Sequence, residues 1–186
     1  MREFHERGAV KITPASCYFA DTLDPARRDD EMSLTCFVGP HDYDLGMVHE
    51  SILRIRADRC RLEIEHAKPA DHYLYCFSVD YRIRLFADFH ANAWVLIHDQ
   101  VEFIRRPIPA VRKALPGWHV ELGQAKYIDP YSMLQLLPNS GAEMFFFKHI
   151  RFMYQHEWRF VALPPPNCDG PEGDGGSSTA LLDVAK

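Results

Sequence analysis

The chain lacks the short motifs that hold nucleotides or build the common catalytic sites. It contains no G-x-x-x-x-G-K-[ST] or G-x-G-x-x-G loop, no G-x-S-x-G elbow and no H-E-x-x-H pair. These absences argue against P-loop ATPases, Rossmann dehydrogenases and esterases that use a nucleophile elbow. The five cysteines are scattered and never stand at C-x-x-C spacing, so neither a zinc knuckle nor a disulfide framework is indicated. We therefore expect no metal site.

Long apolar runs are also missing. No run approaches the roughly 18 residues of a membrane span, and residues 1–7 lack the apolar stretch of a signal peptide. We expect a cytoplasmic protein without a membrane partner.

Outside the C-terminal end, neither sign of charge is much in excess of the other. The formal net charge is −5, of which −3 falls on residues 164–186, so the remaining body is nearly neutral. A nucleic-acid partner is therefore not expected, although one small basic and aromatic cluster keeps that reading open: Arg105, Arg106, Arg112, Lys113 and Trp118.

What is present indicates one α+β domain over residues 1–163, with a mixed or antiparallel sheet core and short helices. Residues 164–166 are three prolines, and the following stretch is rich in Gly, Pro, Ser and acids. We expect 164–186 to be a disordered tail, because such a composition buries little apolar surface. An alternative for the apolar patch at residues 180–182 is that it docks on the body.

Patterning predicts the elements of the body. Residues 52–56 and 60–65 alternate apolar and charged side chains, which is typical of a hairpin with one wet face. Residues 99–115 have helical spacing interrupted by two prolines, so a kinked or broken helix is expected. A short helix is expected at 130–137. Further strands are predicted at residues 10–13, 34–38, 73–78, 93–97, 118–128 and 158–163.

Glu157 is the residue that most invites a functional reading. It stands between Gln155 and Arg159, at the point where an aromatic run gives way to a strand. A carboxylate in such apolar company must be paired, hydrogen-bonded or functional. One interpretation is that Glu157 pairs with Arg159 or Lys148 and only closes the edge of the core. The other is a site that also uses Ser78, at the end of a buried strand.

Two blocks of the sequence resemble a family of uncharacterised bacterial proteins. These are a strand that ends Tyr75-Cys76-Phe77-Ser78 and a late block formed by Phe147-Lys148, Tyr154, Glu157, Trp158 and Arg159. The similarity spans about residues 8–163 and has looser support in the early Tyr18-Phe19 and Asp24 to Glu31 region. It also implies an upstream strand, which we expect to be missing from this chain.

A weaker resemblance is to ADP-ribosyltransferases, including the DNA-modifying toxin type. There, a Ser follows a central strand and a Glu begins a late strand, often as Gln-x-Glu, which Ser78 and Gln155-x-Glu157 match in order. The resemblance implies NAD as substrate, with Glu157 binding the nicotinamide ribose and Gln155 orienting a macromolecular acceptor. Tyr75 or Tyr154 would stack on nicotinamide.

The early residue that holds NAD in that family has no clear match. Arg28 is the candidate because it is early and flanked by acids, and Arg2 or Arg7 competes with it. The resulting hypothesis is an NAD-consuming enzyme of the toxin or phage-defence kind. The alternative is a non-catalytic protein-binding or defence accessory module in which the Glu157–Arg159 pair is structural.

Overall fold

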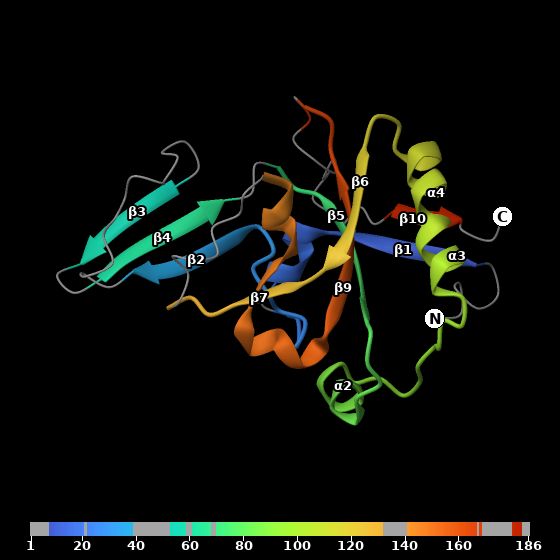
Figure 1. Ribbon diagram of the computed structural model, residues 1–186, viewed down its shortest axis with the longest axis horizontal. Coiled ribbons are helices and arrows are strands. Elements are labelled where there is room, and N and C mark those ends of the chain that lie inside the picture. Colours follow the sequence, from blue (N-terminus) through green and yellow to red (C-terminus); the bar gives the residue numbers. More distant parts are fainter. Residues whose placement is uncertain are drawn as a thin grey trace.

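Five antiparallel strands form the main sheet of the computed structural model, in the order β10-β1-β5-β9-β6 (Figure 1). The structure describes residues 8–20, 22–38, 53–58, 61–67, 70–131, 141–166, 168 and 180–183. The strands are β1 Ala9–Pro14, β5 Tyr73–Ser78, β6 His119–Gln124, β9 Glu157–Leu163 and β10 Ala180–Asp183.

Two smaller sheets accompany the main one. The first is antiparallel, in the order β2-β4-β3, and extends to the left in Figure 1. It contains β2 Ser33–Val38, β3 Leu53–Asp58 and β4 Arg61–Ala67. The second pairs β7 Lys126–Ile128 with β8 Phe147–His149 in parallel. A mixed α+β domain with open sheets, as the sequence predicts, is therefore confirmed.

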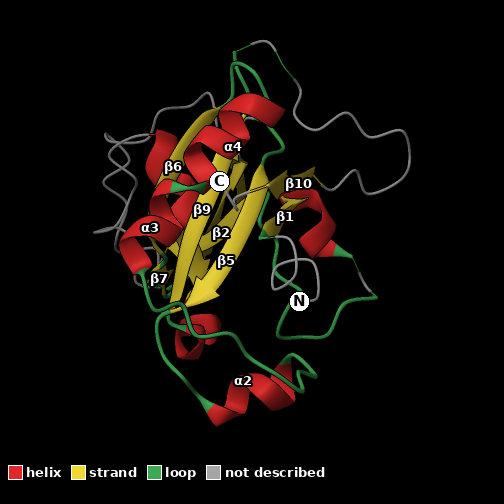
Figure 2. Cartoon of the chain, turned by 90° about the vertical axis from the view of Figure 1, so that its right-hand side faces the viewer, coloured by secondary structure: helices red, strands yellow, loops and turns green. Residues whose placement is uncertain are grey.

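Short helices complete the fold. The α-helices are α2 Ile83–Asp88, α3 Gln100–Arg105 and α4 Pro107–Ala114, and the 3₁₀ helices are η1 Ala15–Phe19, η5 Gly141–Phe146 and η6 Ile150–Gln155. The Asp99 side chain caps α3 by accepting from the Glu102 amide at 2.9 Å. Of the predicted kink or break, the structure has the break, because α3 ends before Pro107 opens α4. Figure 2 shows α3 and α4 over one face of the main sheet.

Alternating side chains divide the core between the two faces of the main sheet. Phe160 and Ala162 of β9 pack with Val111 on the face covered by α4. Val161, between them, packs on the other face with Phe145 and Phe146 of η5. Both faces of β9 are therefore covered along most of its length.

One predicted strand is wrong. Residues 93–97 form no strand, and Trp94 and Leu96 are 54% and 57% exposed. A run of apolar residues cannot by itself identify a strand, because a strand also needs a free sheet edge to pair with. The predicted helix at 130–137 lies mostly outside the described residues.

Four residues of the expected disordered tail form β10, which pairs antiparallel with β1. Leu182 is 1% exposed and joins the core cluster around Val111. The apolar patch thus docks on the body, while most of residues 167–179 lie outside the described part.

Among all the residues that the structure describes, no helix is long and apolar enough to cross a membrane.

Candidate functional site

Glu157 begins β9 directly after a tight change of direction. His156 adopts a left-handed backbone conformation (φ 43°) that ends η6, and Glu157 then enters the sheet. Its side chain is only 5% exposed, and both carboxylate oxygens are engaged. Lys148 Nζ lies 2.7 Å from Oε2, and Arg159 Nε lies 3.1 Å from Oε1. The Glu157 amide also donates to the Tyr127 hydroxyl at 2.8 Å.

Arg159 shares the sheet face of Glu157 because strand side chains alternate. Its side chain is fully buried, and its guanidinium divides its donors among several acceptors. Nη2 donates to Glu31 Oε1 at 2.7 Å, and Nη1 lies 3.0 Å from the Phe145 carbonyl oxygen. The planar fork of Arg suits this arrangement, since one side chain satisfies carboxylate and backbone acceptors in different directions.

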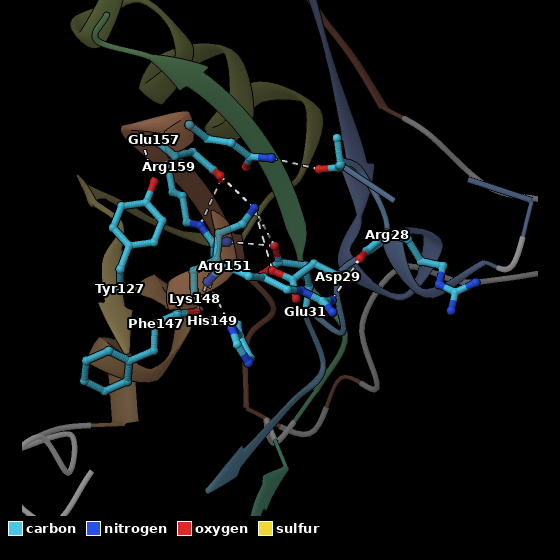
Figure 3. Close-up of polar contacts among 12 residues, drawn as sticks. Arg28, Asp29, Glu31, Tyr127, Phe147, Lys148, His149, Arg151, Glu157 and Arg159 are labelled. Atoms are coloured by element: carbon cyan, nitrogen blue, oxygen red, sulfur yellow. Dashed lines mark hydrogen bonds and ion pairs between the residues drawn. The ribbon is translucent and has the colours of Figure 1, made fainter. Parts of the chain in front are cut away.

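Lys148 and two early acids complete the group that we call the buried charge cluster: Asp29, Glu31, Lys148, Glu157 and Arg159. Lys148 Nζ lies 3.6 Å from Glu31 Oε1 and 3.7 Å from Asp29 Oδ2. Figure 3 shows these side chains converging from β8, β9 and the segment before β2. The cluster holds three carboxylates against two cations, so its charges nearly balance.

The pKa values follow from burial and from these neighbours. Burial raises the pKa of Glu157, but Arg159 and Lys148 outweigh it and hold that pKa below its ordinary value. For Asp29, burial and then the Glu31 charge raise the pKa to about 6. Burial lowers the pKa of Lys148, yet the surrounding carboxylates bring it above its usual range. At neutral pH, Glu157 is therefore an ionised and fully paired carboxylate.

Ser78 and Gln155 do lie beside Glu157, but through contacts of their own. Ser78 is the register partner of Glu157, and its hydroxyl lies 2.8 Å from the Gln155 carbonyl oxygen and 2.9 Å from that of Asp80. The Gln155 amide group donates to the Ala26 carbonyl oxygen at 2.8 Å. Gln155 ends η6 and is not a strand residue, so the expected strand alternation does not relate it to Glu157.

Arg28 is not brought to Glu157. Its backbone carbonyl oxygen accepts from Arg151 Nη2 at 3.4 Å, and its exposed side chain points away from the buried charge cluster (Figure 3). The alternatives Arg2 and Arg7 lie outside the described residues.

The two tyrosines proposed to stack on nicotinamide lie apart from each other. Tyr75 packs on the helix-covered face of the sheet, where its ring centroid is 6.3 Å from that of Phe103. That face is opposite to the one that carries Glu157. Tyr154 is half-buried in η6, with the guanidinium of Arg84 3.9 Å from its ring centroid. The six sequence candidates therefore do not line one common surface.

The sequence interpretation that Glu157 pairs with Arg159 or Lys148 agrees with the structure, which contains both pairs. Sequence reasoning did not find that Asp29 and Glu31 join them, because nothing local marks these two acids for burial within the charged run from Asp24 to Glu31. In the structure, Asp29, Glu31 and Lys148 are 9%, 3% and 7% exposed. Local spacing carries no signal for a contact such as Glu31–Arg159, which joins residues 128 positions apart.

Among the described residues, no group of three or more His, Cys, Asp or Glu side chains is arranged to hold a metal ion. No protein-family model matches the chain, and neither curated proteins nor solved structures show significant similarity to it.

Proposed function

We propose that this chain is a non-catalytic protein-binding module. The observation that carries the proposal is an exposed apolar segment, residues 79–101, which we call the apolar strap. Of the 11 large hydrophobic side chains exposed in the described part, seven belong to it: Val79, Tyr81, Ile83, Trp94, Val95, Leu96 and Val101. Concentrated apolar exposure of this kind is typical of protein interaction sites.

The apolar strap is held in place by polar and aromatic contacts and turns apolar groups outward. All six residues of α2 are at least partly exposed, and Ile83 is 80% exposed. Arg27 Nη2 donates to the Phe89 carbonyl oxygen at 2.6 Å, and His90 Nε2 lies 3.2 Å from Asp24 Oδ1. An ordinary surface helix has the reverse arrangement, with its apolar side toward the core.

The state of Glu157 supports the non-catalytic part of the proposal. A general base or a carboxylate that stabilises a cationic transition state must reach the substrate. Both oxygens of Glu157 instead bind buried cations. Breaking such a pair leaves an uncompensated buried charge, which costs about 3–5 kcal/mol.

The NAD-consuming activity expected from the resemblance is the competing hypothesis, and one variant tests both. The protein and Glu157→Gln are incubated with NAD, and nicotinamide release and thermal unfolding are measured. We expect no release from either protein and a strongly lowered melting temperature for Glu157→Gln. Glu102→Gln, which changes an exposed acid of α3, is the matched control and should melt like the parent. Release that Glu157→Gln abolishes without changing the melting temperature would overturn the proposal.

Binding itself is tested by capture. The tagged protein is incubated with an extract of the cells that produce it and with an untagged copy of itself. We expect capture of a protein that Ile83→Glu loses and Phe19→Glu retains, since Phe19 is 64% exposed but lies outside the apolar strap. Capture of nothing, or capture that both variants affect equally, would count against the apolar strap as a binding surface.

A further inference from the structure

We infer that the partner of the apolar strap is the strap of a second copy of this chain, paired about a two-fold axis. The inference rests on the proposed function, because it assigns an occupant to that binding surface. It is carried by three features of the described residues: the apolar area, the internal balance of charge, and the fixed shape of the surface.

The exposed area is of the size that a dimer needs. The seven exposed hydrophobic residues of the apolar strap are between 43% and 80% exposed. Together they expose on the order of 700 Å², taking about 150–200 Å² for a fully exposed large residue. A stable interface buries roughly 800 Å² on each partner. The apolar strap therefore exposes an apolar area comparable in size with one side of such an interface.

The aromatic contacts make the central part of the area continuous. Tyr81, which precedes α2, lies 5.2 Å from Trp94 between ring centroids, and 5.8 Å from Phe86. The Tyr81–Trp94 contact joins the segment before α2 to the segment that runs from α2 to α3 in Figure 1. Large aromatic side chains at the centre of an interface are typical binding hot spots.

The apolar strap carries little net charge. Residues 79–101 hold three acidic and two basic side chains, a difference of −1. Arg82 pairs with Asp80 at 3.1 Å and Arg84 with Asp88 at 2.9 Å, while the Asp99 side chain accepts from the Glu102 amide at 2.9 Å. The surface therefore offers little net field to a nucleic acid or a highly charged protein. A second copy meets little like-charge repulsion there, although the whole chain carries −5.

The surface is also fixed before a partner arrives. Arg84 stacks on Tyr154, and Arg27 holds the Phe89 carbonyl at the C-terminal end of α2. A fixed surface loses little conformational entropy on association. In a two-fold interface the same patch lies on both subunits, so every favourable contact between the two straps occurs twice. This favours self-association of a nearly neutral apolar surface.

Sedimentation velocity under reducing conditions, at about 1–100 µM protein, tests the inference. We expect the parent to shift from monomer to dimer across this range. Ile83→Glu should weaken the dimer about a hundredfold or more, because it places an uncompensated charge in the interface. Phe19→Glu should dimerise like the parent, and all three proteins should share one melting temperature at the lowest concentration.

A monomeric parent at the highest concentration, or a dimer that Ile83→Glu leaves intact, would overturn the inference. If the parent is monomeric and captures a different protein through Ile83, the apolar strap binds a foreign partner. The proposed function then stands and only the second copy is wrong. If neither a copy nor another protein is captured, the proposed function fails as well.

Discussion

At the scale of single residues, we expect the buried charge cluster to tolerate substitution poorly. Five ionisable side chains share a site from which water is largely excluded, and each partner compensates another. Replacing a whole buried ion pair with apolar groups is often harmless, whereas removing one member strands its partner. We therefore expect conservative changes within the cluster to be costly when they alter the number or direction of hydrogen bonds.

Arg159→Lys is such a change. A lysine ammonium keeps the charge but lacks the planar fork that reaches Glu157, Glu31 and the Phe145 carbonyl at once. We expect unfolding in urea to show a loss of about 2–4 kcal/mol. Arg112→Lys, on the exposed side of α4, is the control and should change stability by less than about 0.5 kcal/mol. Equal stability of the two variants would mean that charge alone matters at position 159.

Asp29 gives the cluster a dependence on pH. Its pKa of about 6 in the folded protein lies above the ordinary value of 3.8, mainly because burial disfavours the charged form. The folded state therefore binds this proton more tightly than the unfolded state does. The resulting stabilisation is fully present below about pH 4 and is lost as the pH rises through 6, by on the order of 2–3 kcal/mol.

Asp29→Asn should remove this dependence, since the amide does not titrate. We expect the stability of the variant, relative to the parent, to rise between pH 4 and pH 7 in paired urea titrations. A relative stability that falls over the same range would show that ionised Asp29 stabilises the protein through Lys148, 3.7 Å away.

At the scale of elements, β10 shows how a short segment completes the sheet. It pairs with residues 9–12 of β1 and places Leu182 against the core on the α4 side. The strand β6, at the opposite edge, approaches η5 closely at Gly123. There, a Cβ atom would lie 2.9 Å from the Phe146 ring. At each edge of the main sheet, one residue therefore determines the close packing: Leu182 of β10 against the core and Gly123 of β6 against η5.

Leu182→Ala tests whether β10 belongs to the folded core. Leu182 is 1% exposed, so truncation should leave a cavity and cost about 2–4 kcal/mol in urea unfolding. Leu96→Ala removes the same atoms from a residue that is 57% exposed and should cost far less. Similar losses for the two variants would contradict the docking of residues 180–183.

The sequence predicted elements best where local chemistry repeats. Alternation located the β3–β4 hairpin, and two prolines located the break between α3 and α4. The prediction of a strand at 93–97 was wrong. The apolar side chains of this run are exposed on the apolar strap, and its backbone pairs with no sheet. The contacts of the buried charge cluster were largely out of reach, since Glu31 and Arg159 meet only after the chain has folded. The Glu157–Arg159 pair, two residues apart on one strand, was predictable from alternation, and Lys148 was the other partner expected for Glu157.

At the scale of the whole molecule, an association of two copies couples stability to concentration. Anything that binds the folded state but not the unfolded state stabilises it by mass action. We therefore expect the melting temperature of the parent to rise with protein concentration, while that of Ile83→Glu stays constant. A melting temperature independent of concentration in both proteins would agree with a monomer and contradict the second-copy interface.

The pairing of β1 with β10 also bears on the timing of folding during synthesis. β1 is translated well before Ala180–Asp183, so its register with that segment cannot form until those residues have been translated. Until then, β1 keeps an open edge along residues 9–12, although the pairings of β5 and β9 need no residue beyond 163. Pairings between such distant segments form slowly, and an open edge is a site for mispairing. The open edge of β1 therefore remains available for mispairing until residues 180–183 have been added.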